Sequence, residues 1–540
     1  MPVIKSEIDT TSELFQANKK AMLEKIEEFR ALESRIRETS NSKKEKFEKR
    51  GQLLPRERLS LLLDKGAPFL HLATLAGLGM HDDDGKTEVH GGGVIIGIGY
   101  VSGIRCMIKV SDSAIKGGTT APMGLEKTLR AQEIVLKNKL PVVNLVESGG
   151  ANLLYQAEIF VKGGMGFANQ ARISAAGIPQ VTVVHGSSTA GGAYLPGLSD
   201  YVIMVKERAK VFLAGPPLLK AATGEIATDE ELGGAHMHST VSGVSEYLAE
   251  NDEDGIRIAR EILQSLPWNE NGPEQSRHHD YKDPLYSSED LLGIVSTDYK
   301  KPYDVGEIIA RITDGSEFLD FKELYGSATV CGHAKIEGQA VGILGNNGPI
   351  DAQGAAKAAQ FIQLCCQSGT PLIFLQNTTG FMVGTEAEQS GIVKHGSKMI
   401  QAVTNATVPK ITLQIGASFG AGNYGMCGRA FDPRFIFAWP NYQIAVMGGE
   451  QAAKVLSIVT EEKFRRMGQE PDREALDKME AGIIARTRKE STALYATARL
   501  WDDGLIDPRD TRKVLSYCLS IALEGDKRNT NSNTFGVARM

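Results

Sequence analysis

The chain has 540 residues, of which 42% are hydrophobic, and its 60 basic and 66 acidic side chains give a formal net charge of −6. This length leaves room for two large domains, and the near balance of charge gives no reason to expect nucleic acid as a partner. The longest apolar stretches are strand-sized and interrupted by glycine or charge, so no membrane-spanning segment is predicted.

The N-terminal segment MPVIKSEIDTTSELFQANKK contains acidic residues and no arginine. This composition argues against a secretory signal and a mitochondrial presequence, so we expect a cytoplasmic protein. Residues 12–50 are rich in charge, with Leu14, Met22, Ile26 and Phe29 at roughly helical spacing. The spacing predicts an N-terminal helical segment that packs one apolar stripe against a neighbour.

A second feature is a segment that occurs twice, with a constant offset between the two copies. In each copy an apolar run (PVVNLVESGG, then PLIFLQNTTG) leads to a second one (PQVTVVHGSSTAGGAY, then PKITLQIGASFGAGNY), and both runs break into turns of small residues. The repeat predicts two related folding units. The matched positions are Pro141 and Pro371, Gly150 and Gly380, Pro179 and Pro409, Gly186 and Gly416, Gly192 and Gly422, and Tyr194 and Tyr424.

The order of segments predicts how these units divide the chain. Residues 51–265 alternate short apolar strands with helix-like segments, which predicts an α/β fold. Residues 266–289 begin with a stretch rich in Pro, Asn, Gly and charge, and are interpreted as a linker. The second unit is expected over 290–525, and residues 526–540 form a polar C-terminal tail.

The paired glycine turns are the candidate site. A strand that ends in glycines before a helix leaves backbone N–H groups without internal partners, and the missing side chains let a ligand oxygen approach them. Two such oxyanion holes in one chain suit a reaction in which two different oxygens gain negative charge. The alternative is structural: the glycines only let helices pack closely on strands.

Other catalytic and metal motifs have little support. Gly416-Ala417-Ser418-Phe419-Gly420 matches the G-x-S-x-G nucleophile elbow, but the last histidine, His395, precedes Ser418, whereas that fold needs an acid and a histidine after the serine. The six cysteines are too sparse for a disulfide framework, and the ten histidines form no metal-binding cluster, so no metal is expected. Neither G-x-G-x-x-G after a strand nor a P-loop is present.

The sequence resembles one protein family over nearly its whole length. The stretches LLPRERLSLLLD, ESGGANL, SSTAGGAY, FLAGPPLLKAATGE, LQNTTGFMVG, GASFGAGNYGMCGRAFDPRFIFAWPN, VMGGEQAA and WDDGLIDPRDTR are similar to the carboxyltransferase (beta) subunit of biotin-dependent acyl-CoA carboxylases. Within that family, the similarity is strongest to the branch that acts on geranyl-CoA and 3-methylcrotonyl-CoA.

The resemblance implies a fold, cofactors and partners. It implies two tandem crotonase-like domains, each a β-β-α superhelix, with the active site between the N-domain of one subunit and the C-domain of another. It also implies coenzyme A as part of the substrate, and an alpha subunit that carries biotin carboxylase and covalent biotin, in an assembly of six alpha and six beta subunits. The sequence agrees by omission, since it contains no A-M-K-M biotinylation site.

The resemblance also implies which backbone groups do the chemistry. Gly149 and Gly150 would hold the thioester oxygen of the acyl-CoA, while Ala421 and Gly422 would hold the ureido oxygen of biotin, with Gly420 shaping the turn. Biotin itself would supply the base. The residues expected to contact substrate are Ser148, Ala151, Gly163, Gly164, Gly191, Gly192, Thr379, Gly380 and Phe381.

Substrate choice depends on the segment EIFVKGGMGFANQ. Gly163, Gly164 and Gly166 stand where the methylcrotonyl-specific pattern implies bulkier residues, so we expect room for a longer acyl chain and prefer geranyl-CoA, with 3-methylcrotonyl-CoA as the alternative. A shorter surface loop would also explain the segment. More distant alternatives are a biotin-dependent decarboxylase, a noncatalytic scaffold, and a hydratase, for which Glu147 would need a second glutamate where Asn377 stands.

Overall fold

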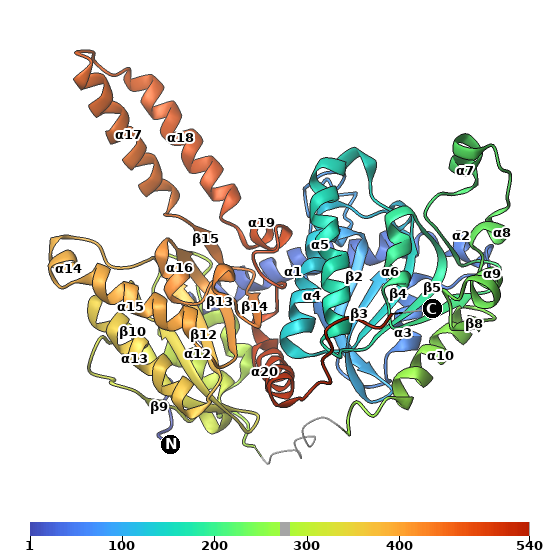
Figure 1. Ribbon diagram of the computed structural model, residues 1–540. Coiled ribbons are helices and arrows are strands. Elements are labelled where there is room, and N and C mark those ends of the chain that lie inside the picture. Colours follow the sequence, from blue (N-terminus) through green and yellow to red (C-terminus); the bar gives the residue numbers. More distant parts are fainter. Residues whose placement is uncertain (271–280, 539–540) are drawn as a thin grey trace. The chain divides into compact units, whose positions relative to one another are not determined.

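The computed structural model describes residues 1–270 and 281–538, which form two compact units (Figure 1). The N-terminal unit consists of Arg30 to the end of the first half of the chain, with Ala498–Leu500 and the residues from Ile521 on. The C-terminal unit consists of the second half up to Thr497, with Met1–Phe29 and Trp501–Ser520. Residues 271–280 of the predicted linker lie outside the described residues.

The N-terminal unit is built on one sheet with the strand order β1-β2-β3-β4-β5-β6-β8, and β7 also pairs with β5. The pairs β1·β2 and β2·β3 are antiparallel, and the pairs from β3 to β8 are parallel. The strands are β1 (Leu70–Leu72), β2 (Val94–Val101), β3 (Ile104–Ser111), β4 (Val142–Ser148), β5 (Gln180–Thr189), β6 (Tyr201–Val205), β7 (Lys210–Phe212) and β8 (Tyr247–Ala249).

Helices connect and cover these strands. They are α2 (Lys44–Glu48), α3 (Pro55–Leu62), α4 (Pro122–Asn138), α5 (Gln156–Ala175), α6 (Tyr194–Gly197), α7 (Pro216–Thr223), α8 (Asp229–Gly233), α9 (Ala235–Met237) and α10 (Asp252–Ser265). The predicted α/β architecture of this region is confirmed.

The C-terminal unit repeats the plan with the strand order β14-β13-β12-β11-β10-β9, and β15 also pairs with β13. Its strands are β9 (Leu319–Asp320), β10 (Thr329–Ile336), β11 (Gln339–Asn346), β12 (Leu372–Thr378), β13 (Lys410–Phe419), β14 (Phe435–Ala438) and β15 (Gln443–Ala445). Its helices are α11 (Leu291–Ile294), α12 (Val305–Ile312), α13 (Ala352–Ser368), α14 (Thr385–Gln389), α15 (Ile392–Asn405), α16 (Ala421–Gly425), α17 (Gly449–Arg466), α18 (Arg473–Glu490) and α19 (Ala493–Ala498). The last helix, α20 (Thr511–Lys527), begins in this unit, and its residues from Ile521 on belong to the N-terminal unit.

The two sheets confirm the duplication and extend it beyond the sequence repeat. Helices α4 and α13, strands β4 and β12, and strands β5 and β13 all begin at the constant offset of the sequence repeat. The preceding hairpins β2–β3 and β10–β11 also correspond, but at a slightly larger offset. The change in offset falls in the loop before the helix, which covers residues 112–121 in the N-terminal unit and only 347–351 in the C-terminal unit.

The central strands explain why the apolar runs lack alternation. All ten residues of β13 are buried, and so are eight of the ten residues of β5. A parallel strand covered on both faces has no solvent side, so its sequence is apolar or small at nearly every position. The glycine turns that follow these runs therefore lie at the carboxyl ends of central strands, where open α/β sheets bind their ligands.

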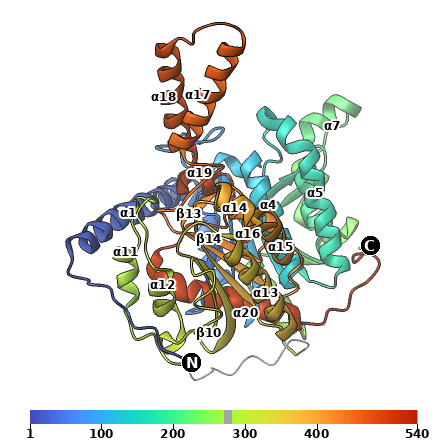
Figure 2. The ribbon, with the colours of Figure 1, turned by 90° about the vertical axis from the view of Figure 1, so that its left-hand side faces the viewer.

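The predicted N-terminal helix is confirmed as α1 (Glu13–Asn41), shown in Figure 2, followed by the short α2. Met22, Ile26 and Phe29 are buried as predicted. Leu14 is the exception, because 58% of its surface is exposed and the neighbouring Phe15 is buried in its place. The helical register near the start of α1 therefore differs by one position from the predicted stripe.

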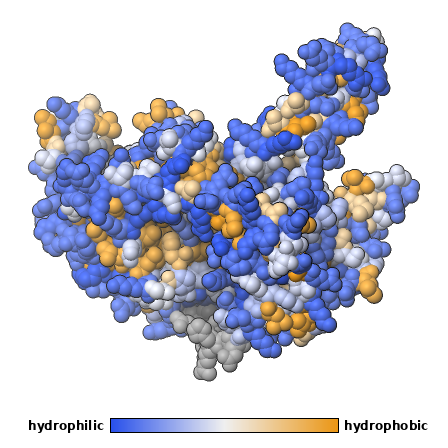
Figure 3. All heavy atoms as spheres, turned by 180° about the vertical axis from the view of Figure 1, so that it is seen from behind, coloured by the Kyte–Doolittle hydropathy of each residue, from blue (hydrophilic) through white to orange (hydrophobic). Residues whose placement is uncertain are grey.

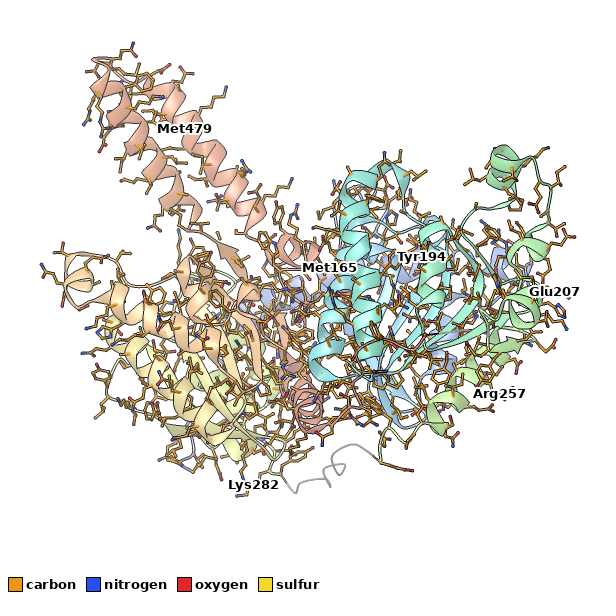
Figure 4. All side chains as sticks on the ribbon, viewed as in Figure 1. Met165, Tyr194, Glu207, Arg257, Lys282 and Met479 are labelled. Carbon is orange, nitrogen blue, oxygen red and sulfur yellow. The ribbon has the colours of Figure 1, made fainter. Side chains whose placement is uncertain are left out.

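Helices α17 and α18 form a hairpin that projects away from the sheet of the C-terminal unit (Figures 1 and 2). Leu476 is buried within it, and Met479 lies on α18 (Figure 4). Figure 3 shows apolar atoms among the polar surface of the hairpin. Within residues 1–270 and 281–538, no helix is both long and apolar enough to cross a bilayer. The exposed apolar side chains of α17 include Val455, Leu456, Ile458 and Val459.

Candidate active site

The first glycine loop follows β4 in the N-terminal unit. The pairing of β4 with β5 shifts register between Val146 and Ser148, so Ser148 lies opposite Ser188. The amide of Gly150 donates to Oγ of Ser148 at 3.1 Å, and its carbonyl accepts the amide of Thr120 at 2.8 Å. Gly150 therefore shapes the loop with both of its backbone groups, and it does so at φ +84°, a conformation that favours glycine.

The amide of Gly149 is placed differently. Gly149 is exposed, and its amide makes no hydrogen bond among the residues that the structure describes. Of the two amides assigned to this loop from the sequence, only the Gly149 amide is without a hydrogen bond in the described part of the chain.

The second loop of the N-terminal unit follows β5. Oγ of Ser188 donates to the carbonyl of Gly192 at 2.9 Å, and Ala190 to Ala193 form a single 3-10 turn that leads into α6. The first amides of a helical turn have no partner inside it. In the described part of the chain, the amide of Gly191 makes no hydrogen bond. Figure 4 labels Tyr194, which follows this turn, and Met165 on α5.

The C-terminal unit repeats the first loop after β12. The register shift falls between Gln376 and Thr378, which places Thr378 opposite Ser418. The amide of Gly380 donates to Oγ1 of Thr378 at 3.2 Å, and its carbonyl accepts the amide of Ile350 at 3.0 Å. These bonds match those of the first loop after β4, so the duplicated sequence builds the same loop twice.

The fourth loop follows β13 and carries α16. The amides of Ala421 and Gly422 begin this helix, and neither makes a hydrogen bond within residues 1–270 and 281–538. A Cβ atom on Gly422 would lie 2.9 Å from Cα of Gly380 and 2.8 Å from Cγ2 of Thr378. Only glycine lets the two loops of this unit approach so closely.

Ser418 does not have the surroundings of a nucleophile. Its side chain is fully buried, its hydroxyl donates to Oε1 of Gln376 at 2.8 Å, and it accepts the side-chain amide of Asn423 at 2.8 Å. An activated serine needs a neighbouring base and access to substrate. The geometry therefore gives Ser418 a structural role.

Glu147 is the penultimate residue of β4 and is held by three neighbours. Its carboxylate accepts Nη1 of Arg58 at 2.9 Å, Oγ of Ser113 at 2.9 Å, and Nε2 of Gln52 at 3.4 Å. A carboxylate engaged in this way is poorly placed to act as a general base, which argues against the hydratase alternative.

Arg58 extends this network into the core. Its Nε donates to Asp252 at 3.0 Å, and Asp252 accepts Nδ1–H of His185 at 2.8 Å. Burial raises the pKa of Asp252, but the hydrogen bond from His185 and the charge of Arg58 outweigh it and lower the pKa to about 2. Burial and the charge of Arg58 lower the pKa of His185. Sequence reasoning missed this network because its members are far apart in the chain.

The remaining predicted contact residues fall into three groups. Ala151 and Thr379 are exposed beside the first loops, whereas Phe381 is partly buried and packs on the apolar clusters beneath α15 and α16. Gly163 and Gly164 lie inside α5, so their segment is a helix and not the loop of the alternative interpretation, although Gly164 is exposed on the surface of that helix. A Cβ atom at either glycine would meet no other atom within 4 Å.

The chemistry available at these loops comes from the backbone. Among the described residues, no three His, Cys, Asp or Glu side chains are placed to hold a metal ion together. The loops present backbone amides after β4, at Gly149, and at the starts of the helical turns that follow β5 and β13. Backbone amides so placed are a recurring way to stabilise negative charge on an oxygen.

Comparison with known proteins places this geometry in a family. Residues 46–536 match the carboxyl transferase domain. The chain is 47% identical over 556 residues to the probable methylcrotonoyl-CoA carboxylase beta chain, mitochondrial, of Drosophila melanogaster, covering 100% of this chain and 95% of that protein. It is 51% identical over 492 residues to the probable biotin-dependent acyl-coenzyme A carboxylase beta2 subunit of Mycobacterium tuberculosis, covering 91% of each.

A solved structure is similar over the whole length. The crystal structure of the geranyl-CoA carboxylase beta subunit from P. aeruginosa is 62% identical, covers 100% of both chains and superimposes with a TM-score of 0.93.

Proposed function

We propose a substrate and a mechanism for this chain on one premise: it belongs to the carboxyl transferase family and is the carboxyltransferase component of a biotin-dependent acyl-CoA carboxylase. Its two units are tandem crotonase-like domains, as the resemblance implied. The boundaries 51–265 and 290–525 for the two domains, with 12–50, 266–289 and 526–540 around them, are part of the proposal.

The proposed reaction carboxylates the γ carbon of geranyl-CoA. An α,β-unsaturated acyl-CoA with a β-methyl group can lose a proton from that methyl, because the charge spreads through the double bond to the thioester oxygen. The observation that carries this choice is the 62% identity, over the full length of both chains, to the geranyl-CoA carboxylase beta subunit, against 47% to the methylcrotonoyl-CoA carboxylase chain from Drosophila. The alternative substrate is 3-methylcrotonyl-CoA, as in leucine catabolism.

Helix α5 supports room for the longer chain. Gly163 and Gly164 present no side chain, and the space where a Cβ atom would stand is open at both positions. We propose that the distal part of the acyl group lies along this stretch of α5, where bulkier residues would exclude it.

The backbone amides of the loops stabilise the charges. Gly191 and Gly192 occupy the positions that Ala421 and Gly422 occupy in the second repeat. We therefore propose the amides of Gly191 and Gly192, together with that of Gly149, for the thioester oxygen. Gly150 is the residue that shapes the loop, which refines the sequence-based hypothesis, because its amide is already engaged by Ser148.

The residues of the C-terminal unit fit biotin. Ala421 and Gly422 offer two adjacent, unpartnered amides at the start of α16, within the part of the chain that the structure describes, and this donor set suits one ureido oxygen. When bound, carboxybiotin supplies the carboxyl group and a ureido nitrogen that accepts the proton. Ala421 and Gly422 then orient the ring and stabilise charge on its oxygen, while Gly420 shapes the turn and the exposed Thr379 borders the site.

The contribution of each backbone donor to transition-state stabilisation can be measured. Removal of one donor from an oxyanion hole costs about 3 to 4 kcal/mol of transition-state stabilisation. Placing the two reacting groups face to face adds the advantage of proximity, which is worth roughly 7 to 11 kcal/mol for well-oriented groups. Ser148 and Ala151 beside the first loop, and Gly380 and Phe381 beside the second, are proposed to keep these donors in place.

The proposed partners are an alpha subunit that carries biotin covalently and further copies of this chain. We propose that the active site forms between the N-terminal unit of one copy and the C-terminal unit of another, in an assembly of six alpha and six beta subunits. The exposed apolar side chains of α17 support a covered surface on the hairpin. The proposed location is the cytoplasm; the six cysteines, all free in the structure, are compatible with a reducing compartment.

An acyl-CoA series tests the substrate proposal. The purified complex of alpha and beta subunits is given ATP, bicarbonate and either geranyl-CoA or 3-methylcrotonyl-CoA, and kcat/KM is measured for each. Geranyl-CoA is expected to have the higher kcat/KM. A higher value for 3-methylcrotonyl-CoA would support the alternative, and release rather than fixation of bicarbonate as the favoured direction would support the decarboxylase.

A further inference from the structure

The two units differ at the buried positions next to their matching loops. Val146 and Val184 of the N-terminal unit correspond to Gln376 and Gln414 of the C-terminal unit in the register of the repeat. All four side chains are buried. Two glutamines in a core are costly unless their polar atoms have partners, so their presence in only one repeat needs a local reason.

Gln376 has a complete set of partners. Its Nε2 donates to the carbonyl of Met426 at 2.7 Å and to that of Asn423 at 3.3 Å. Its Oε1 accepts Oγ of Ser418 at 2.8 Å and Nε2 of Gln414 at 3.3 Å. A glutamine amide has two donor hydrogens and one oxygen with two lone pairs, and here all of them are used.

These hydrogen bonds connect α16 to strands β12 and β13. Asn423 lies in the middle of α16 and Met426 is its C-terminal capping residue, while Gln376 is on β12 and Ser418 on β13. The side-chain amide of Asn423 closes the ring by donating to Ser418 at 2.8 Å. The helix is thus fixed by its own carbonyls and one side chain, and its first amides remain outside the network.

The N-terminal unit holds its corresponding turn by other means. Ala193 stands where Asn423 stands and has no polar side chain, and Ser188, which corresponds to Ser418, donates to the carbonyl of Gly192. The carbonyl of Leu195 in α6 instead accepts Nε2 of Gln170 on α5 at 2.7 Å. The hydrogen bonds that Gln376 makes to α16 and Ser418, called the clamp below, are therefore specific to the unit proposed to bind biotin.

We infer that Gln376 is the positioning residue of the biotin-side loop: it holds α16 so that the amides of Ala421 and Gly422 converge on one oxygen. The inference rests on the proposed function of this loop. A displacement of about 1 Å in a reacting group can cost about 100-fold in rate. Loss of the clamp should therefore lower the efficiency toward biotin by about 10- to 100-fold and leave recognition of the acyl-CoA nearly unchanged.

The test uses the full-length chain in the reverse direction, with a carboxylated acyl-CoA as donor and free biocytin as acceptor. Three variants are compared. Gln376→Met removes all four hydrogen bonds at similar volume. Gln376→Glu keeps an acceptor for Ser418 and Gln414 but turns a carboxylate toward two carbonyls. Gln180→Met is the control, because Gln180 is also buried but lies at the other end of β5, where its side chain donates to the carbonyl of Gln170.

The expected result is a split between the two substrates. Gln376→Met should lower kcat/KM for biocytin 10- to 100-fold while KM for the acyl-CoA changes less than twofold, and Gln180→Met should change neither by more than twofold. Gln376→Glu should recover toward wild type as the pH falls from 8 to 6, because a protonated carboxyl regains one donor, while Gln376→Met should show no such recovery relative to wild type.

The outcomes separate this inference from the proposed function. If wild type transfers no carboxyl group from any acyl-CoA to biocytin, the proposed function is wrong. If wild type is active and Gln376→Met keeps its efficiency toward biocytin within twofold, or loses efficiency equally toward both substrates, the inference is overturned. Should Gln376→Met fail to fold, the pH response of Gln376→Glu decides, and an absence of recovery at low pH contradicts the positioning role.

Discussion

The two units form nearly the same backbone loops, but the side chains that support the loops are charged in the N-terminal unit and neutral in the C-terminal unit. In the N-terminal unit, the penultimate residue of β4 is Glu147, which is tied to Arg58 and through it to the buried Asp252 in a charged network. In the C-terminal unit the same position is Asn377, which accepts the amide of Ala417 at 3.0 Å. The difference teaches that the backbone geometry is the feature common to both repeats, while the side chains beneath it have diverged.

The glycines of the repeat follow from that common geometry. A Cβ atom on Gly186 would lie 2.8 Å from Cγ of Glu147, and one on Gly416 would lie 2.3 Å from Oδ1 of Asn377. In both units a polar side chain crosses the neighbouring strand at a position where no side chain fits. The residue that crosses has changed, but the space it needs has not.

The largest expected effect comes from removing Arg58, the cation that joins the carboxylates of Glu147 and Asp252. Arg58→Met leaves the buried carboxylate of Asp252 and the partly buried carboxylate of Glu147 without their cation, and breaking a buried ion pair costs about 3 to 5 kcal/mol. Urea denaturation should show a loss of this size in the free energy of unfolding. Arg257→Met, which removes an exposed arginine from Asp254, is the control and should change stability little. Equal losses in both variants would mean that the network contributes no more than a surface pair.

The next effect tests the backbone donors of the C-terminal unit. Ala421→Pro removes one N–H at the first position of α16, where proline is compatible with a helix, so the fold should persist. Carboxyl transfer should fall about 100- to 1,000-fold. Ser418→Ala should retain appreciable activity, because it removes the bonds of Ser418 to Gln376 and Asn423 but leaves both bonds from Gln376 to the carbonyls of Asn423 and Met426 in place. The reverse ranking of the two variants in a carboxylation assay would favour a nucleophilic serine.

A smaller effect concerns the raised pKa of Asp502, a buried carboxyl group of the C-terminal unit. Burial raises the pKa of Asp502 to about 7, from an ordinary value of 3.8. The folded state therefore binds a proton that the unfolded state has lost between about pH 4 and pH 7, so the carboxyl lowers stability as the pH rises through this window. Asp502→Asn should gain roughly 2 to 3 kcal/mol over wild type between pH 5 and pH 8.

This prediction is checked by denaturation of both proteins across that pH range. The hydrogen bonds that Asp502 accepts from Thr497 and Gly504 can be kept by the asparagine oxygen, so these two bonds are common to both proteins and the pH dependence of the difference reports on the charge. A difference in stability that does not depend on pH would show that Asp502 titrates normally in the folded chain.

The smallest effect concerns acyl chain length in the N-terminal unit. Gly163→Phe should lower the ratio of kcat/KM for geranyl-CoA to that for 3-methylcrotonyl-CoA about tenfold, the scale at which a filled pocket discriminates between apolar groups. Steady-state kinetics of the holoenzyme with both substrates measure the ratio. An equal fall for both substrates would place the acyl chain elsewhere.

Much of the fold could be predicted from the sequence because it is local. Apolar runs broken by glycine mark β4, β5, β12 and β13, and equal spacing marks the duplication. The correspondence between the hairpins β2–β3 and β10–β11 was not found in the sequence, because the loop before the next helix is longer in the first copy. A gap of that kind breaks a pattern based on constant spacing.

The site was predictable only in part. Positions of the glycine turns follow from the chain, but the direction of an amide does not, so only the structure shows that the amide of Gly150 is engaged by Ser148. The supporting networks were missed for a different reason: their members converge from distant elements. Comparing the repeats position by position would have revealed one signal, the pairs Val146 with Gln376 and Val184 with Gln414.

A crystal structure of the holoenzyme with acyl-CoA and biotin bound tests the two-loop mechanism most directly. We predict that the thioester oxygen lies about 2.7 to 3.1 Å from amides of the loops at Gly149 and Gly191, and that the ureido oxygen of biotin lies at the same distance from the amides of Ala421 and Gly422. A complex in which either oxygen is held by ionisable side chains, away from these amides, would contradict it.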